Sequence, residues 1–260
     1  MRAGGTFATM IVLTLAAVSA SAQTTGDQLN PMQIAIACAS PTSAAEPALD
    51  TLKIIGGQNV EPRSVFDTHD LLVVNGGTGH GVALGQEYYV RSVRTYAGAA
   101  EALSRALRTS AWIKIVAIDE TTAIASVTFA CGPIYTNDYL EPFVAPNPPD
   151  NADRVDTSGE LDFAAPARVI YANDERTNAA VGDFVLIEQP AEHGAASGDR
   201  VAFYRDPGNV GMYGDPRDTG MPLLALGEGV VVSVGPSKVL VRVNQARSAI
   251  QTGDYAVRRK

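Results

Sequence analysis

The sequence has few of the residues that build metal, redox and ligand sites: 2 cysteines, 3 histidines and 1 tryptophan in 260 residues. Two cysteines are too few for a disulfide-dense miniprotein or for a four-cysteine zinc site. Lysine and arginine number 20 against 28 acidic residues, so the formal net charge is −8. This balance argues against a nucleic-acid partner and against docking on anionic lipid, because both need a basic surface. The hydrophobic fraction of 46% is typical of a globular protein.

Residues 1–22 are typical of a signal peptide. Arg2 supplies the positive charge, residues 7–18 form an uncharged apolar stretch that is short for a membrane span, and Ala20-Ser21-Ala22 matches the small-x-small pattern that signal peptidase cleaves. The polar run at 23–30 argues against the alternative, a membrane anchor. We therefore expect an exported protein, periplasmic or extracellular, with no transmembrane segment in the mature chain.

Export gives Cys38 and Cys131 an oxidising compartment, and no third cysteine competes with them. We therefore predict a disulfide between these two residues. Residues 23–52 lack hydrophobic periodicity and are expected to form an irregular N-terminal segment. The disulfide would tie that segment to the first folded unit.

The mature chain contains one sequence pattern twice. Residues 113–139 align without a gap with residues 229–255, and upstream residues 70–74 align with 183–187. The identical pairs of the longer block are Val116/Val232, Val127/Val243, Ala130/Ala246, Ile134/Ile250, Thr136/Thr252, Asp138/Asp254 and Tyr139/Tyr255. Two collinear blocks indicate an internal duplication.

Each copy reads as short strands, because apolar runs rich in Val, Ile and Tyr are bounded by Gly, Asn, Asp and Pro. Residues 119–122 and 235–238 are turn sequences, so the second half of each copy is predicted to be a β-hairpin. Residues 97–109 are the exception, since their Ala, Leu, Glu and Arg favour a helix. The counterpart at 207–222 is rich in Gly and Pro and is expected to be a loop.

These patterns predict a mainly β protein with two small tandem β-barrels and one short helix in the first. Barrel closure is favoured because it removes exposed sheet edges. The expected domains are 53–141 and 166–260, and the Pro-rich segment 142–165 is expected to be an extended linker between them.

A resemblance to a known domain family follows from these residues. Residues 181–255 carry Val-Gly-Asp-Phe-Val, Gly-Asp-x-x-x-Phe-Tyr-Arg-Asp and Gly-Asp-Tyr, and resemble a small SH3-like β-barrel domain. Such domains occur at the C-terminal end of bacterial envelope proteins with LysM modules and in the flagellar assembly T protein. The first copy is similar to exported bacterial proteins through Cys38, residues 54–57 and residues 112–125. The resemblance implies a barrel fold and an envelope setting, and it carries no catalytic residues.

The glycine-rich run at 73–81 is one candidate binding loop. A strand followed by glycines can cradle a phosphate, but only if a helix N-terminus comes next, and residues 86–93 read as a strand. Glycines that adopt positive φ angles in a hairpin loop explain the run better. Gly77, Gly79 and His80 remain candidate contacts for a partner.

His80 and His193 fall at equivalent positions of the two copies and would have to face each other to bind a metal. Metal sites need three or four ligands at regular spacing, and no His-x-x-x-His or Cys-x-x-Cys pattern is present, so solvated loop histidines are the preferred interpretation. Trp112 heads a predicted strand, where it either stacks on a ligand or lies half-buried at a barrel mouth.

The sequence contains neither a Gly-x-Ser-x-Gly elbow nor a Gly-Asp-Ser-Gly motif, so no hydrolase triad is predicted. We therefore predict a non-enzymatic envelope protein without a cofactor that acts as a protein-interaction or structural module. The partner is expected to be another envelope protein. The alternative is an accessory protein that binds peptidoglycan or another cell-wall glycan through exposed aromatic residues.

Overall fold

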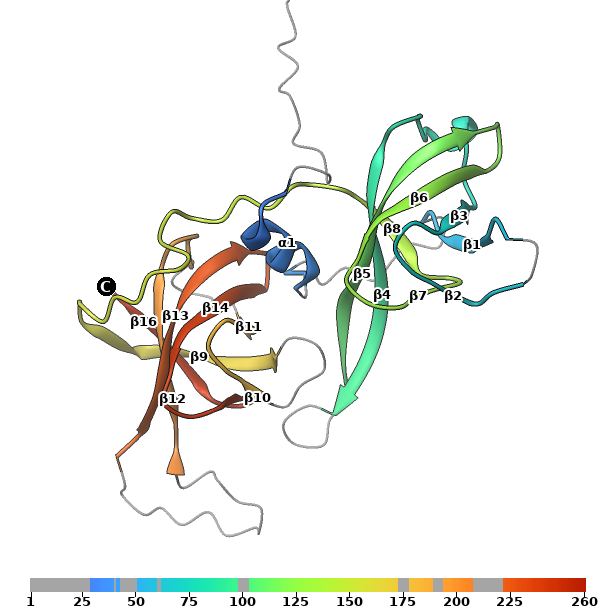
Figure 1. Cartoon of the computed structure of the whole chain (residues 1–260). Helices are drawn as coiled ribbons and strands as arrows, with labels where there is room; N and C mark the ends of the chain where they lie inside the picture. The colour runs from blue at the N-terminus through green and yellow to red at the C-terminus, as the bar shows by residue number, and fades with distance from the viewer. Residues whose placement is uncertain are drawn as a thin grey trace, which may run out of the picture.

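The structure is a computed structural model of the chain, and it describes residues 29–39, 41–42, 51–59, 62–97, 103–172, 178–188, 194–207 and 222–260. Two barrel-like units lie side by side, and one α-helix sits between them (Figure 1). The prediction of a mainly β protein with two barrels is therefore confirmed. The predicted signal peptide lies outside the described residues.

The first unit, barrel 1, is a curled six-stranded sheet with the order β1-β3-β6-β5-β4-β8. Its strands are β1 (Ile54–Gly57), β3 (Leu71–Val74), β4 (Glu87–Ala97), β5 (Leu103–Ile118), β6 (Ala123–Ala130) and β8 (Tyr139–Pro142). A bridge between Lys53 and Tyr139 joins the two ends of the sheet, and β2 (Val65–Phe66) pairs with β7 (Ile134–Tyr135) beside it. The inward side chains form one apolar core, as the alternation of a half-buried strand requires.

The second unit, barrel 2, is a closed barrel with the order β11-β14-β13-β12-β16-β9. Its strands are β9 (Leu161–Ala172), β11 (Phe184–Glu188), β12 (Arg200–Arg205), β13 (Leu224–Val234), β14 (Lys238–Ala246) and β16 (Tyr255–Arg259). A small pair, β10 (Asn178–Ala179) with β15 (Ile250–Gln251), stands beside the barrel as β2 and β7 stand beside barrel 1.

The two units match strand for strand, which supports the predicted duplication. Each strand of barrel 1 has a counterpart with the same neighbours in barrel 2, from β1 and β9 to β8 and β16. Even the irregularities coincide: the register shift after the Val90–Ala111 pair recurs after the Phe203–Gly227 pair. Because bulges fix register and local twist, the two sheets are built on one template.

Three turns recur in both units and share one design. In each, a residue with positive φ is followed by an Asp or Gln whose side chain accepts a hydrogen bond from the backbone N–H three residues earlier. The pairs are His69-Asp70 with Gly182-Asp183, Gly85-Gln86 with Gly198-Asp199, and Asn137-Asp138 with Gly253-Asp254. His69 is thus a turn residue in a position that glycine takes in barrel 2.

We expect Asp254→Ala to lower the free energy of unfolding by about 3 kcal/mol. Asp254 is 5% exposed, caps its turn through the N–H of Gln251 at 2.6 Å, and accepts two hydrogen bonds from Arg205 at 2.7 and 2.8 Å. The substitution leaves the largely buried guanidinium without its carboxylate. Urea unfolding followed by circular dichroism measures the loss.

Asp153→Ala is the matched control, because Asp153 also pairs with an arginine, Arg242 at 2.7 Å, but is 72% exposed. A surface pair of this kind contributes about 0 to 1 kcal/mol. Equal losses for the two variants would contradict the role given to Asp254.

The helix predicted at 97–109 is wrong. Residues up to Ala97 belong to β4 and residues from Leu103 belong to β5, and the two strands pair continuously down to Ala97 and Leu103. Helix propensity is a weak preference, and the ladder to the neighbouring strand overrides it. The predicted loop at 207–222 lies mostly outside the described residues.

The N-terminal segment is not wholly irregular, because it contains the helix α1 (Pro31–Cys38). Asn30 caps this helix and accepts from the N–H of Gln33, whose side chain in turn accepts from the N–H of Asn30. This capping box and the proline at the first position explain why the helix begins here. The linker is also shorter than predicted, since β9 begins at Leu161.

Candidate functional site

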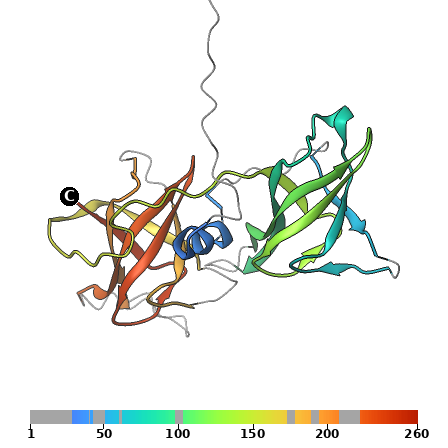
Figure 2. The same cartoon turned by 45° about the horizontal axis from the view of Figure 1, so that its top comes forward.

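Helix α1 lies between the two barrels, and both of its sides are apolar (Figure 2). One side, with Met32 and Ile36, packs on Phe184, Leu186, Val232 and Leu240 of barrel 2. The other side carries Ile34 and Ala37, which pack against barrel 1 in a cluster with Tyr89, Trp112, Phe129 and Phe143. A short helix with two apolar sides is stable only when both sides are covered, so α1 joins the two units.

Covalent and polar contacts fasten α1 in this position. Cys38 and Cys131 lie at disulfide distance, with 2.02 Å between the sulfur atoms, as predicted. Thr109 of β5 donates from Oγ1 to the carbonyl oxygen of Ala39 at 3.2 Å. Gln33 donates from Nε2 to the carbonyl oxygen of Pro146 in the linker at 2.9 Å. The helix is therefore tied to barrel 1 and to the linker at once.

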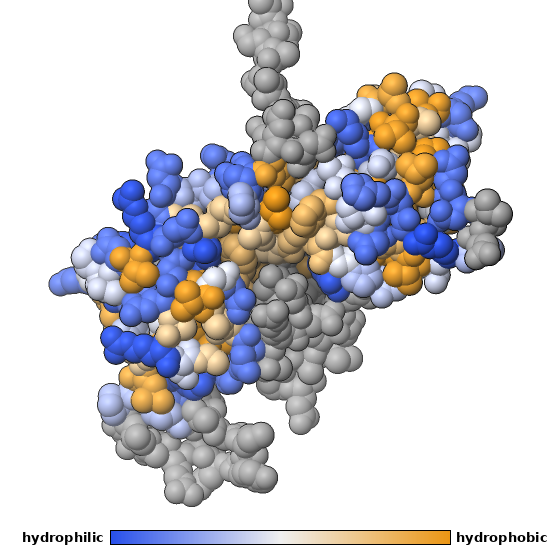
Figure 3. Space-filling view, viewed as in Figure 1, coloured by the Kyte–Doolittle hydropathy of each residue, from blue (hydrophilic) through white to orange (hydrophobic). Residues whose placement is uncertain are grey.

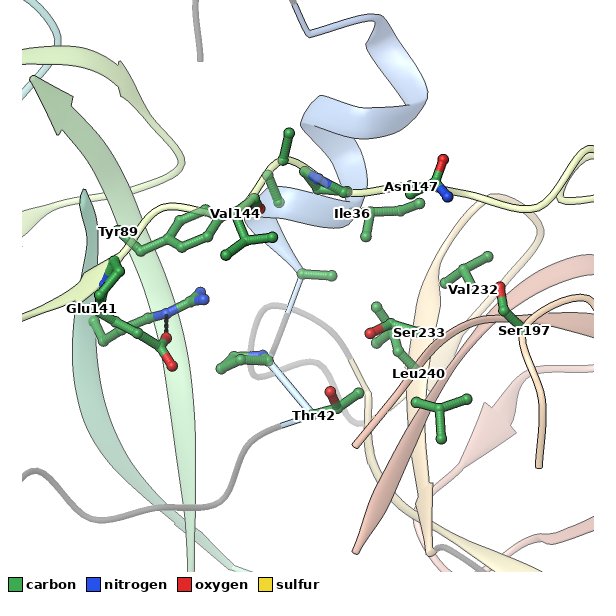
Figure 4. A pocket seen from close by; sticks show the side chains of 18 of the residues that line it. Ile36, Thr42, Tyr89, Glu141, Val144, Asn147, Ser197, Val232, Ser233 and Leu240 are labelled. Atoms are coloured by element: carbon green, nitrogen blue, oxygen red, sulfur yellow. Dashed lines mark hydrogen bonds and ion pairs between the residues drawn. The ribbon is translucent and has the colours of Figure 1, made fainter. Parts of the chain in front are cut away.

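A groove of about 610 Å³ opens where α1, the linker and the two barrels meet (Figure 4). Its walls come from α1, from β4 and β8 of barrel 1, from residues 144–147 of the linker, and from β13 and β14 of barrel 2. The apolar part of the lining includes Ile36, Val144, Val232 and Leu240. A concave site of this size with mostly apolar walls is typical of ligand pockets.

The charged groups of the groove lie at its barrel 1 end. Arg91 has a side chain that is 8% exposed, and its Nε donates to Glu141 Oε2 at 2.8 Å. Its guanidinium also donates to the hydroxyl of Thr109, and its central carbon lies 4.1 Å from the centre of the Tyr89 ring. This arrangement holds the arginine plane fixed at the wall, with the charge balanced by Glu141.

Tyr89 is a neutral donor in this site. Burial raises the pKa of Tyr89 to about 12, and its hydroxyl donates to the carbonyl oxygen of Val144 at 2.8 Å. A phenol that is protonated at neutral pH and already engaged with the backbone cannot act as a base. Its role is to hold the linker against barrel 1.

The candidate residues of the glycine-rich loop lie away from the groove. Gly79 and His80 belong to the 3-10 turn η2 (Thr78–His80), and Gly77 is its N-cap residue. This turn packs on the turn between β5 and β6. The N–H groups of Thr78 and Gly79 donate to the carbonyl oxygens of Asp119 and Glu120 at 2.9 and 3.0 Å, so they are not available to a phosphate.

The explanation through positive φ was wrong for Gly76, Gly77 and Gly79, which are needed for close packing instead. Gly77 has a φ of −128°, and a Cβ there would collide with the carbonyl oxygen of Asp119. Positive φ occurs instead at Gly81 and Gly85. The imidazole of His80 is exposed, and His193 lies outside the described residues.

Trp112 is not in a loop and is not available to stack on a ligand. It lies within β5, is 1% exposed, and stacks on Phe129 with ring centres 4.8 Å apart. The Trp112 ring is therefore part of the barrel 1 surface on which α1 packs.

No family model matches this sequence, and no curated protein matches it either. The site is therefore interpreted from its own chemistry. Within the described ranges, no helix is long and apolar enough to cross a membrane, and no group of three or more His, Cys, Asp or Glu stands close enough to hold a metal ion.

Sequence reasoning missed α1, Arg91 and Glu141 as parts of one site. The capping box at Asn30 and Gln33 was a usable signal for the helix. Nothing local in the sequence marks the two charged residues, because their pairing depends on β4 lying beside β8.

Proposed function

We propose that this protein is an exported, non-enzymatic interaction module that holds an extended segment of a partner protein in the groove between its barrels. The observation that carries the proposal is that barrel 1, barrel 2, the linker and α1 all contribute walls to one groove and are fastened to one another. A preformed site needs little ordering when the partner binds.

The chemistry of the groove favours a peptide segment with apolar side chains. Its apolar walls suit such side chains, and the single ion pair of Arg91 and Glu141 leaves that end without net charge. Glu141 is the one carboxylate among the described lining residues, and it is paired at 2.8 Å. Recognition of a peptide by such a groove requires contact alone. The disulfide is compatible with export, which stays part of the proposal.

A photo-crosslinking amino acid at position 233 in the groove tests the proposal in the native cell envelope. We expect a defined protein adduct from position 233 and none from position 155, whose valine is 50% exposed and does not line the groove. Val144→Arg should reduce the adduct, because it places a long charged side chain at the edge of the groove, where Val144 is 72% exposed. Equal adducts from both positions would contradict the groove as the binding site.

The glycan-binding alternative has one observation in its favour, an aromatic pair on barrel 2. Phe163 is 47% exposed and meets Tyr204 edge to face, with ring centres 5.4 Å apart. Exposed aromatic faces are suited to sugar stacking. If the protein sediments with purified peptidoglycan and Phe163→Ala abolishes this while Val144→Arg does not, the glycan function replaces the groove function.

A further inference from the structure

The outer face of barrel 2 that α1 covers has an exposed counterpart on barrel 1. On barrel 2 this face is formed by Ile170, Phe184, Leu186, Val232 and Leu240. The strand registers align these residues, in the same order, with Ile55, Leu71, Val73, Val116 and Ile124 of barrel 1. Every member of both sets is apolar. We define the barrel 1 set as the exposed face.

The two faces differ in what covers them. Under α1, the four barrel 2 side chains from β11, β13 and β14 are 2% to 4% exposed. In the exposed face, Ile55 is 48%, Leu71 37% and Val116 46% exposed. Leu84, in the turn that precedes β4, is 66% exposed. The backbone N–H of the next residue, Gly85, donates to the carbonyl oxygen of Ile115, so this turn lies beside β5. Apolar side chains gather over this part of barrel 1 in Figure 3.

An outward sheet face in water normally carries polar residues between the inward apolar ones. The inward neighbours Leu72 and Val74 already fill the core of barrel 1, so the outward Leu71 and Val73 are not needed there. A contiguous apolar face on four neighbouring strands is a mark of an interaction surface. None of the exposed face lines the groove.

We propose that the exposed face is a docking site for a short apolar helix of a partner protein, seated as α1 is seated on barrel 2. The internal copy defines the ligand chemistry: α1 contacts its face through Met32, Ala35, Ile36 and Ala39, which follow the i, i+3, i+4, i+7 spacing of one helical stripe. The α1 helix of a second copy is not the occupant, because α1 is covered on both sides and held by the disulfide.

The probe for this site is a fluorescent peptide with the sequence of residues 29–42 and Cys38 replaced by serine. We expect saturable binding to the full-length protein by fluorescence anisotropy. Val116→Asp should weaken it by about tenfold or more, since a charge must then be buried under the helix. Val181→Asp, at a valine that is 60% exposed on barrel 2, should leave it unchanged. The same peptide with Ile36→Asp should also lose binding.

Three results would overturn the proposal. The first is no binding at peptide concentrations up to about 1 mM. A dissociation constant above that value means a binding free energy weaker than about 4 kcal/mol. The second is equal binding by the two protein variants, which places the peptide elsewhere. The third is a dimer in sedimentation analysis that Val116→Asp dissociates, which makes the exposed face a contact between copies. Circular dichroism confirms that both variants are folded. The groove function is tested separately, since its crosslinks do not involve this face.

Discussion

Replacing Cys38 and Cys131 by alanine is expected to lower the free energy of unfolding by about 4 to 5 kcal/mol. The two residues are 93 positions apart, and a crosslink over a loop of that length removes much of the conformational entropy of the unfolded chain. Urea unfolding of the oxidised protein and of the double variant measures the difference. A loss of less than about 1 kcal/mol would contradict the prediction. It would mean that the disulfide removes little conformational entropy from the unfolded chain.

The same variant should also loosen α1, and the chain has one tryptophan to report it. Trp112 belongs to the cluster that holds Cys38, Cys131 and Ile34 against barrel 1. In the variant we expect its emission to shift to longer wavelength at urea concentrations where the barrels are still folded by circular dichroism. Coincident transitions would instead mean that α1 and the barrels unfold as one unit.

Trp112→Ala is expected to lower the free energy of unfolding by about 4 kcal/mol, the largest effect of any single substitution considered. The ring is 1% exposed and contacts Phe129 and Phe143, with ring centres 4.8 and 6.0 Å away, so its removal leaves a cavity under α1. Thermal or urea unfolding measures the loss.

Trp112→Phe should cost far less, about 1 to 2 kcal/mol. Within the described part of the chain, Trp112 Nε1 has no hydrogen-bond partner, so phenylalanine gives up ring volume and no hydrogen bond. A phenylalanine variant that is as unstable as the alanine variant would contradict this and would mean that the indole N–H makes a stabilising hydrogen bond.

Local signals in the sequence were sufficient for most of the strands and turns. Turn residues such as Gly182 and Asp183 fix positive φ and a side-chain cap within four residues, and the duplicated pattern fixed the matching of the two units. The helix predicted at 97–109 failed because residues 103–109 pair with β4, and a helix propensity of a few tenths of a kcal/mol per residue cannot compete with such a ladder.

The candidate site depends on contacts that are distant in sequence, so most of it could not be predicted. Arg91 and Glu141 are brought together by the β4–β8 pair, and Val232 reaches the groove only through the placement of α1. Trp112 shows the same limit: a lone tryptophan in a strand is compatible with a binding platform, and its burial follows from the helix and Phe129 that cover it.

The position of α1 has a consequence for the order in which the chain matures. The helix stands ahead of barrel 1 in the sequence, yet one of its two sides packs on strands from the last third of the chain. The N-terminus of a nascent chain emerges from the ribosome first, so the side chains of Met32 and Ile36 stay exposed to water until β14 has been synthesised. A chain interrupted before that strand would leave the apolar side chains of residues 31–38 uncovered, and chaperones and proteases recognise such exposed segments.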